Sequence, residues 1–111
     1  MGFDLLVAEI LIELKKKYAN IYIEGAKPCI NQTNGWGRDY VIRYNLVLNN
    51  IDKTTLTSNF SYYNGCYQIR NKYMVDSSDL VVGCQLNKSA GTESTINYAI
   101  KKNKNIILIK S

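Results

Sequence analysis

The sequence predicts an α/β protein whose helices cover both faces of a mostly parallel sheet of about four strands. Two continuous apolar runs of strand length, residues 80–84 and 106–109, flank a segment with helical periodicity. Strands buried on both faces have such continuous apolar sequences, and parallel strands need a long crossover between them. The 111 residues, of which 46% are hydrophobic, suffice for one domain, and we expect it to span residues 1–111.

The first two elements follow from the spacing of apolar residues. A helix is predicted over residues 3–18, because its inward positions recur every three or four residues: Phe3, Val7, Ile10, Leu11, Leu14 and Tyr18. Asp4 near its start and the three lysines of residues 15–17 at its end match the helix dipole. A short strand is predicted at residues 21–23, ended by Gly25 and Pro28.

The remaining elements alternate in the same way. A second helix is predicted after the turn at Asn34-Gly35, with one face made of Trp36, Tyr40, Tyr44 and Val47. Residues 54–57 contain three β-branched threonines and predict a second strand. A third helix is expected at about residues 66–76. A Gly91-Thr92 turn opens a fourth helix with three inward positions, Ile96, Ala99 and Ile100.

Composition excludes several classes of function. The chain has no histidine, which rules out Ser-His-Asp triads, Cys-His dyads and histidine zinc sites. Its cysteines, Cys29, Cys66 and Cys84, are odd in number and far apart, which is typical of a reducing cytoplasm. Aspartates 39, 76 and 79 are too scattered for a metal site, and we expect no cofactor. No apolar run approaches the roughly 20 residues that span a bilayer, so we expect a soluble cytoplasmic protein.

The chain begins with a helix, where doubly wound sheets begin with a strand and a glycine-rich turn. Without that strand, residues 21–25 and 80–84 either pair directly, in the order 54–57, 21–25, 80–84, 106–109, or keep free edges. Free edges and surplus apolar surface favour a homo-oligomer, most simply a homodimer with the first helix as its interface. The alternative is a fragment from which the first strand has been cut away.

A candidate ligand site lies where strand 80–84 ends. Ala90, Gly91 and Thr92 offer backbone N–H groups, a hydroxyl and the positive end of a helix, which suit a phosphate. Lys88 adds charge, and the guanidinium fork of Arg70 suits a phosphate or carboxylate. The alternative is structural: Gly91 makes a tight turn, Thr92 caps the helix, and Arg70 faces solvent.

Other signals are weaker. Trp36, Tyr40 and Tyr44 either stack on a base or belong to the core, and Pro28 and Tyr63 are candidates for a pocket wall, as are Tyr62 and Tyr67. Arg43 either binds phosphate or pairs with a surface acid. The lysines of residues 15–17 and 101–104 stand at helix C-termini, where lysine is expected in any case. We therefore do not expect nucleic acid as a partner.

Motifs along nearly the whole chain resemble the YpsA-like branch of the SLOG superfamily. They are Met1–Leu5, Pro28-Cys29-x-x-Gln32, Trp36, Arg43-Tyr44-Asn45, Gly65-Cys66, Arg70–Asp79, Gly91-Thr92-x-x-Thr95 and Tyr98-Ala99. The resemblance implies a Rossmann-like three-layer sandwich that binds a nucleotide-derived ligand. Related members include the cytokinin-activating phosphoribohydrolases (LOG proteins), the DNA-processing protein DprA, and sensors of cyclic ADP-ribose signals in anti-phage defence.

Two departures shape what the resemblance implies. The family's first strand and glycine-rich turn are absent, and the glutamate that ends the phosphoribohydrolase motif PGGxGTxxE is Thr95 in this chain. The family's arginine matches Arg70, so Arg70, Lys88, residues 90–92 and Thr95 are the expected phosphate-binding residues. We expect non-catalytic binding of an ADP-ribose-like or cyclic ADP-ribose-like molecule, as in a phage sponge against immune signalling. The alternatives are an N-glycosidase acting on nucleoside monophosphates and a DNA-associated protein like DprA.

Overall fold

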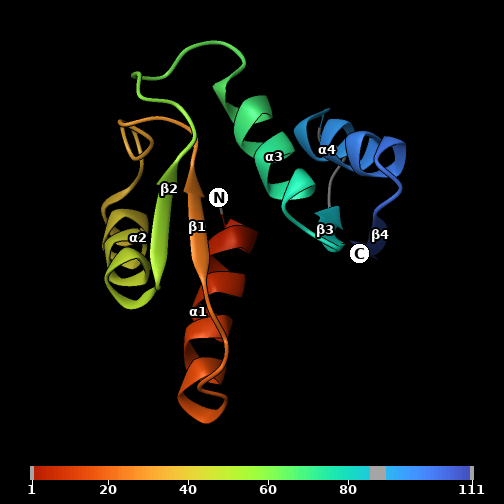
Figure 1. The fold of residues 1–111 in the computed structure, drawn as a ribbon. Coiled ribbons are helices and arrows are strands. Elements are labelled where there is room, and N and C mark those ends of the chain that lie inside the picture. Colours follow the sequence, from red (N-terminus) through yellow and green to blue (C-terminus); the bar gives the residue numbers. More distant parts are fainter. Residues whose placement is uncertain (1, 86–89, 111) are drawn as a thin grey trace.

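A computed structural model describes residues 2–85 and 90–110, and its helices and strands alternate along the chain (Figure 1). The elements are α1 (Gly2–Lys17), β1 (Glu24–Lys27), α2 (Arg38–Asn50), β2 (Lys53–Leu56), α3 (Cys66–Asp76), β3 (Leu80–Gln85), α4 (Ala90–Lys101) and β4 (Asn105–Lys110). The predicted α/β class is confirmed, and the alternation of helices with parallel strands is compatible with a Rossmann-like fold. Among the described residues, no helix is both long and apolar enough to cross a bilayer.

The strands form two separate two-stranded parallel sheets. In one, β1 pairs with β2, from Glu24 opposite Lys53 to Lys27 opposite Leu56. In the other, β3 pairs with β4, from Leu80 opposite Asn105 to Gln85 opposite Lys110. The predicted neighbours within each pair are correct, but β1 and β3 do not pair with each other. The prediction of a single sheet of four strands is therefore wrong. The structure has the other predicted arrangement, in which the strands at residues 24–27 and 80–85 keep free edges.

Two element boundaries differ from the prediction. The first strand begins at Glu24 rather than at residue 21, and it runs through Gly25. A Cβ at Gly25 would lie 2.9 Å from the side-chain Cδ1 of Ile51, so glycine serves close packing there and does not end the strand. The second helix begins after Gly37, which places Trp36 outside the helix whose face it was expected to share.

The elements group into two halves (Figure 1). The α1 helix packs against α2 beside the β1–β2 pair, and α3 packs against α4 beside the β3–β4 pair. The α3 helix also contacts β1 and so joins the halves. The fully or nearly buried apolar residues are few, and both halves contribute: Leu5, Ile23, Cys29, Val47, Cys66, Val75 and Ala99.

Helices cover only one face of the β3–β4 pair. On the covered face, the position of Gly83 lies against Ile96 of α4. On the opposite face the side chains are 44–52% exposed: Leu80, Val82, Ile107 and Ile109. The expectation of strands buried on both faces is therefore wrong, because no described helix packs on that side.

The inward faces predicted for two helices need a similar correction. Several α1 positions expected inside are 36–51% exposed: Val7, Ile10, Leu14 and Tyr18. The buried residue of α1 is Leu5 instead, and the main packing partner of α1 is the α2 helix. In α4, Ala99 is buried as expected, but Ile100 is 58% exposed.

Candidate functional site

One cavity of about 610 Å³ lies between α3, β3 and α4, with the start of α1 in its wall. This volume falls in the usual range of roughly 300–1,000 Å³ for small-molecule sites. The lining residues come from these four elements and from the segment between α3 and β3: Phe3, Asp4, Tyr67, Arg70, Asn71, Met74, Val75, Ser78, Leu80, Val81, Val82, Gly83, Cys84, Gly91, Thr92, Thr95 and Ile96.

The topology explains why polar groups meet at one end of this cavity. The chain leaves β3 at its carboxyl end and enters α4, so the first turn of α4 stands beyond that end of the strand. The α3 helix leads into β3 through residues 77–79, so the earlier part of α3 lies toward the same end. In α/β sheets, ligands bind beyond the carboxyl ends of the strands. The predicted site and the cavity therefore coincide at Arg70, Gly91, Thr92 and Thr95.

Arg70 is the cationic side chain in the lining. Its Nε donates a hydrogen bond of 2.8 Å to Oδ1 of Asn71, and its guanidinium lies 5.3 Å from the ring centre of Tyr67. Within the described residues it forms no ion pair. These contacts orient the guanidinium at the cavity and leave its charge uncompensated by a carboxylate, which suits an anionic ligand.

The start of α4 provides smaller groups. Gly91 is exposed and Thr92 is half-buried, and both line the cavity. Thr95 also lines it, but its hydroxyl donates a hydrogen bond of 2.9 Å to the carbonyl oxygen of Gly91. Glu93 lies outside the lining, in agreement with its position on another side of the helix.

Two further residues of this segment, Ala90 and Lys88, were predicted to bind the phosphate. Ala90 begins α4, so its backbone stands at the helix start. Lys88 lies outside the residues that the structure describes.

Most lining residues were not predicted as site residues, among them Phe3, Asp4 and Asn71. Phe3 and Asp4 belong to the first turn of α1, and Asn71 follows Arg70 on α3. The sequence signal for the first two was available: Met1–Leu5 belongs to the motifs that resemble the family, and a helix start faces the carboxyl edge of a parallel sheet. Tyr67, a candidate for the pocket wall in the sequence, lines the cavity. Burial raises the pKa of Tyr67, so its phenol stays protonated at neutral pH and is able to donate a hydrogen bond.

The residues predicted to stack on a base lie elsewhere. Pro28 is fully buried, and Trp36 packs edge-on against Tyr44 at 5.4 Å between ring centres. Tyr63 makes a similar edge contact with Phe60, at 6.3 Å. These three residues, Pro28, Trp36 and Tyr63, do not line the cavity that contains Arg70. The contact between Trp36 and Tyr44 favours the alternative that these two residues belong to the core.

Arg43 also has a structural partner. Its Nε and Nη2 donate hydrogen bonds of 3.0 and 2.6 Å to the two carboxylate oxygens of Glu9, which ties α2 to α1. This bidentate pair holds the pKa of the Glu9 carboxyl below its usual value. Of the two alternatives for Arg43, the structure has the ion pair with a surface acid.

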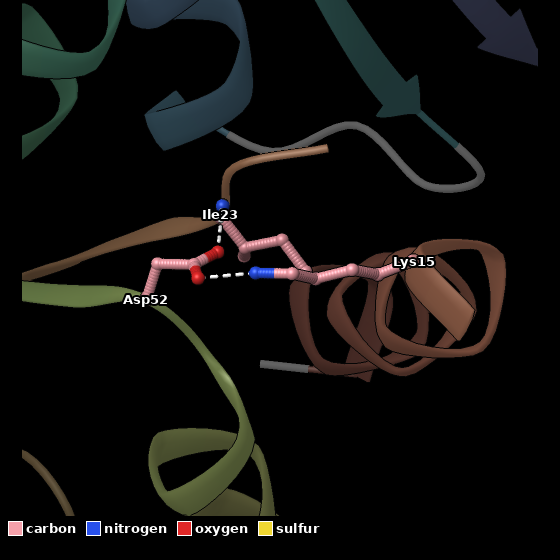
Figure 2. A network of polar contacts seen from close by, with 3 residues as sticks. All are labelled: Lys15, Ile23 and Asp52. Carbon is pink, nitrogen blue, oxygen red and sulfur yellow. Dashed lines mark hydrogen bonds and ion pairs between the residues drawn. The ribbon is translucent and has the colours of Figure 1, made fainter. Parts of the chain in front are cut away.

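A second polar network holds the far end of α1 (Figure 2). The ammonium of Lys15 pairs with one carboxylate oxygen of Asp52, and the backbone N–H of Ile23 donates a 2.7 Å hydrogen bond to the other. The Lys15 contact and then the Ile23 hydrogen bond lower the pKa of Asp52. Part of the lysine cluster of residues 15–17 is thus used within the fold.

Groups suited to other chemistry are sparse in the described part of the chain. Across residues 2–85 and 90–110, no three Cys, Asp or Glu side chains gather closely enough to hold a metal ion. Cys29 and Cys66 are fully buried, and burial raises the pKa of the Cys29 thiol.

The polar groups of the cavity are an arginine, hydroxyls, backbone N–H groups at a helix start and the carboxylate of Asp4. This set suits a phosphorylated ligand bound by an α/β protein.

Comparison with known proteins assigns the family. The model of the YspA SLOG family matches residues 1–110. A UPF0398 protein of Staphylococcus epidermidis is 30% identical over 84 residues, which are 74% of this chain and 44% of that protein. A UPF0398 protein of Bacillus thuringiensis is 22% identical over 103 residues, 92% of this chain and 56% of that protein. The chain belongs to the YspA SLOG family and spans about half the length of the curated relatives it matches.

Proposed function

We propose that this protein binds a nucleotide-derived small molecule, ADP-ribose-like or cyclic ADP-ribose-like, in the cavity beside β3 and does not turn it over. The observation that carries the proposal is the convergence of Arg70 with the α4 start in one cavity at the carboxyl end of β3. The phosphate would contact the Arg70 guanidinium, the backbone of Gly91 and the hydroxyl of Thr92. Preformed N–H donors and a positive helix end favour such a group.

The same cavity has groups for the rest of such a ligand. Asp4 offers a carboxylate that accepts hydrogen bonds from ribose hydroxyls, and Phe3 and Tyr67 offer aromatic surface for a base. All three come from helices that flank the strand, so a ligand of nucleotide length is able to reach them together with Arg70. This assignment replaces Pro28, Trp36 and Tyr63 as the proposed contacts to the base.

Binding without turnover follows from the position of residue 95. Glycosidic cleavage requires a carboxylate or an equivalent group to stabilise the developing cation and to transfer protons. Residue 95 is threonine, and its hydroxyl is engaged by the Gly91 carbonyl. The carboxylate of the lining is Asp4, which belongs to α1 and not to the helix that carries the family's glutamate.

Chromatography separates binding from catalysis. The protein is incubated with AMP, ADP-ribose and cyclic ADP-ribose isomers, and each nucleotide and free adenine are quantified over time. We expect depletion of one nucleotide from the free pool and its intact recovery after the protein is denatured. Time-dependent release of adenine that is lost in Arg70→Ala would contradict the proposal and favour the N-glycosidase. Gly91→Val places a branched side chain at the phosphate and should abolish the depletion.

A biological role follows from stoichiometric binding. A protein that holds an immune signal without consuming it lowers the free concentration of that signal, so we propose a sponge in the cytoplasm against cyclic ADP-ribose-type signalling. Its free, buried thiols fit a reducing compartment. An ADP-ribose-activated effector assayed with increasing protein should lose activity in proportion to the binding sites added. Full effector activity at excess protein would exclude this role.

We also propose a homodimer formed through α1. Leu6, Ile10 and Leu14 stand four residues apart on this helix and are 39–50% exposed. A stripe with this spacing is one face of a helix, and a twofold contact buries it in both copies. Light scattering should give twice the mass of 12.6 kDa, and Ile10→Glu should give the monomer. A folded wild-type monomer at high micromolar concentration would exclude the dimer.

A further inference from the structure

The cavity extends along most of the β3 strand, which a small-molecule site does not require. Five consecutive residues of β3, Leu80–Cys84, line it. Side chains of a strand alternate between two faces, so five consecutive residues reach one cavity only along the edge of the strand. The cavity therefore follows the edge of β3 that does not pair with β4.

That edge has no backbone partner within the described part of the chain. The β3 strand pairs with β4 alone, and no further backbone hydrogen bond joins residues 80–85 to another described segment. Each backbone N–H and C=O is a strong hydrogen-bonding group. An unpaired edge is therefore a template for another extended chain.

The walls of the cavity define the shape of the occupant. The edge is recessed between α3, which contributes Met74 and Val75, and the start of α1, which contributes Phe3. A slender extended peptide fits such a recess, whereas the β3 edge of a second copy is recessed behind its own helices. The mainly aliphatic and aromatic walls suit apolar side chains on both faces of the added strand.

The charge of Arg70 indicates which end of a peptide would bind beside it. Arg70 stands toward the carboxyl end of the cavity and has no ion pair among the described residues. A strand added parallel to β3 has its own carboxyl end there. The α-carboxylate of a polypeptide ending at this point is the complementary group for the guanidinium. Asp4 lies in the first turn of α1, where the helix dipole offsets its charge.

We propose that the β3 edge binds the free, apolar C-terminus of another polypeptide as an added parallel strand, with its terminal carboxylate on Arg70. This inference does not rest on the proposed nucleotide, although the two sites overlap at Arg70 and Phe3. At roughly 3.3 Å per residue, a five-residue terminus spans about 16 Å, the length of the lining segment of β3. Nucleotide and peptide would compete at Arg70.

The test is fluorescence anisotropy with a labelled peptide, Lys-Val-Ile-Val-Val, attached to the dye through its amino end. We expect micromolar binding of the free acid and binding at least about tenfold weaker for the C-terminal amide, which lacks the charged acceptor. The same peptide with alternate amides N-methylated should also lose at least about tenfold, because its N–H donors on one edge are gone. Hydrogen exchange should slow at Leu80–Cys84 only when the free acid is added.

Variants of α3 provide a matched pair. Met74 and Ile69 are each 46% exposed on the same helix, but only Met74 lines the cavity. Met74→Glu should weaken binding at least about tenfold because it places a carboxylate beside the peptide, and Ile69→Glu should change it less than about twofold. The methylated peptide with wild-type protein decides the question if Met74→Glu does not fold.

Several outcomes would overturn the proposal. Equal affinity for the acid, the amide and the methylated peptide would mean apolar adhesion without strand addition. Absence of binding at millimolar peptide would mean that the edge is inaccessible. Protection of Leu80–Cys84 that rises with protein concentration, without peptide, would mean that a second copy covers the edge. If the wild-type protein binds the peptide but no nucleotide, the proposed function is contradicted and this inference still holds.

Discussion

The two halves of the molecule use their charged side chains in opposite ways. All three ion pairs of the described residues lie in the half that contains α1, α2, β1 and β2: Lys15–Asp52, Lys16–Glu13 and Arg43–Glu9. In the other half, α3 packs against α4, and the Tyr98 hydroxyl donates a hydrogen bond of 2.9 Å to Asp76. Arg70, in that second half, faces a cavity.

This difference separates a half held together by ion pairs from the half in which we propose the binding site. Arginine at position 43 has a bidentate carboxylate partner, so its charge is used to join two helices. Arginine at position 70 has a neutral partner, Asn71, so its charge remains available to a ligand. Two arginines of similar partial burial thus have different partners, one a carboxylate and one an amide.

The largest expected effect on stability concerns the apolar packing of the second half. Val75 on α3 is 2% exposed, and Val75→Ala should lower the free energy of unfolding by about 2–3 kcal/mol, since it removes buried methyl groups and leaves a void. Val82→Ala, at a position that is 47% exposed, should cost less than half of that. Urea denaturation of both variants measures the difference, and equal losses would mean that Val75 is not part of the core.

An intermediate effect is expected for the acidic groups of the first half. The pKa of Asp52 lies below its ordinary value of 3.8, first because of Lys15 and then because of the Ile23 N–H. A carboxyl whose pKa is lowered on folding contributes its stability above the unfolded pKa and loses it as the pH falls through the folded pKa. Asp52→Asn should therefore lower the melting temperature at pH 7, and the difference from wild type should shrink below pH 4.

The contribution of Asp52 is checked by melting curves between pH 7 and pH 2.5. Glu9 and Glu24 have pKa values lowered in the same direction, so wild type itself should lose stability over this acidic range. A constant difference between wild type and Asp52→Asn at every pH would show that the carboxylate charge is not what stabilises the junction of α1 with β1.

The smallest effect is expected for the half-buried ion pair between the first two helices. Arg43→Gln removes the bidentate contact with Glu9, and the loss of stability should be small because both groups are accessible to water. The loss should largely disappear in 1 M salt, where the screening length is about 3 Å. A double-mutant cycle with Glu9→Gln measures the coupling, and a coupling unaffected by salt would mean that the pair acts through packing.

Local sequence patterns predicted most of the elements. Helix 66–76 has the predicted bounds, and the strands near residues 54, 80 and 106 lie within one residue of prediction. The strands near residues 80 and 106 coincide with continuous apolar runs, and the strand near residue 54 coincides with a β-branched segment. The strand at 24–27 lies later in the chain than predicted, because Gly25 in the sequence signals a strand end, whereas in the structure its lack of a side chain allows Ile51 to approach.

Long-range features could be predicted only in part. The family motifs identified Arg70, Gly91 and Thr92, since their spacing depends on a strand and helix that are adjacent in the chain. Phe3 and Asp4 reach the same cavity from the other end of the sequence, and no local pattern encodes that distance. Leu80 and Ile107 are exposed because no described helix packs over them, and their apolar character alone does not encode this.

The most direct test of the contrast between the two arginines is isothermal titration of ADP-ribose into three proteins. Wild type should bind with one site per chain. Arg70→Gln should bind more weakly by about 2–5 kcal/mol, or roughly thirtyfold or more, because a desolvated charged contact is lost. Arg43→Gln should match wild type within about twofold, since its partner is Glu9. Absence of binding to wild type, or equal binding by Arg70→Gln once its fold is verified, would contradict the assignment of the cavity.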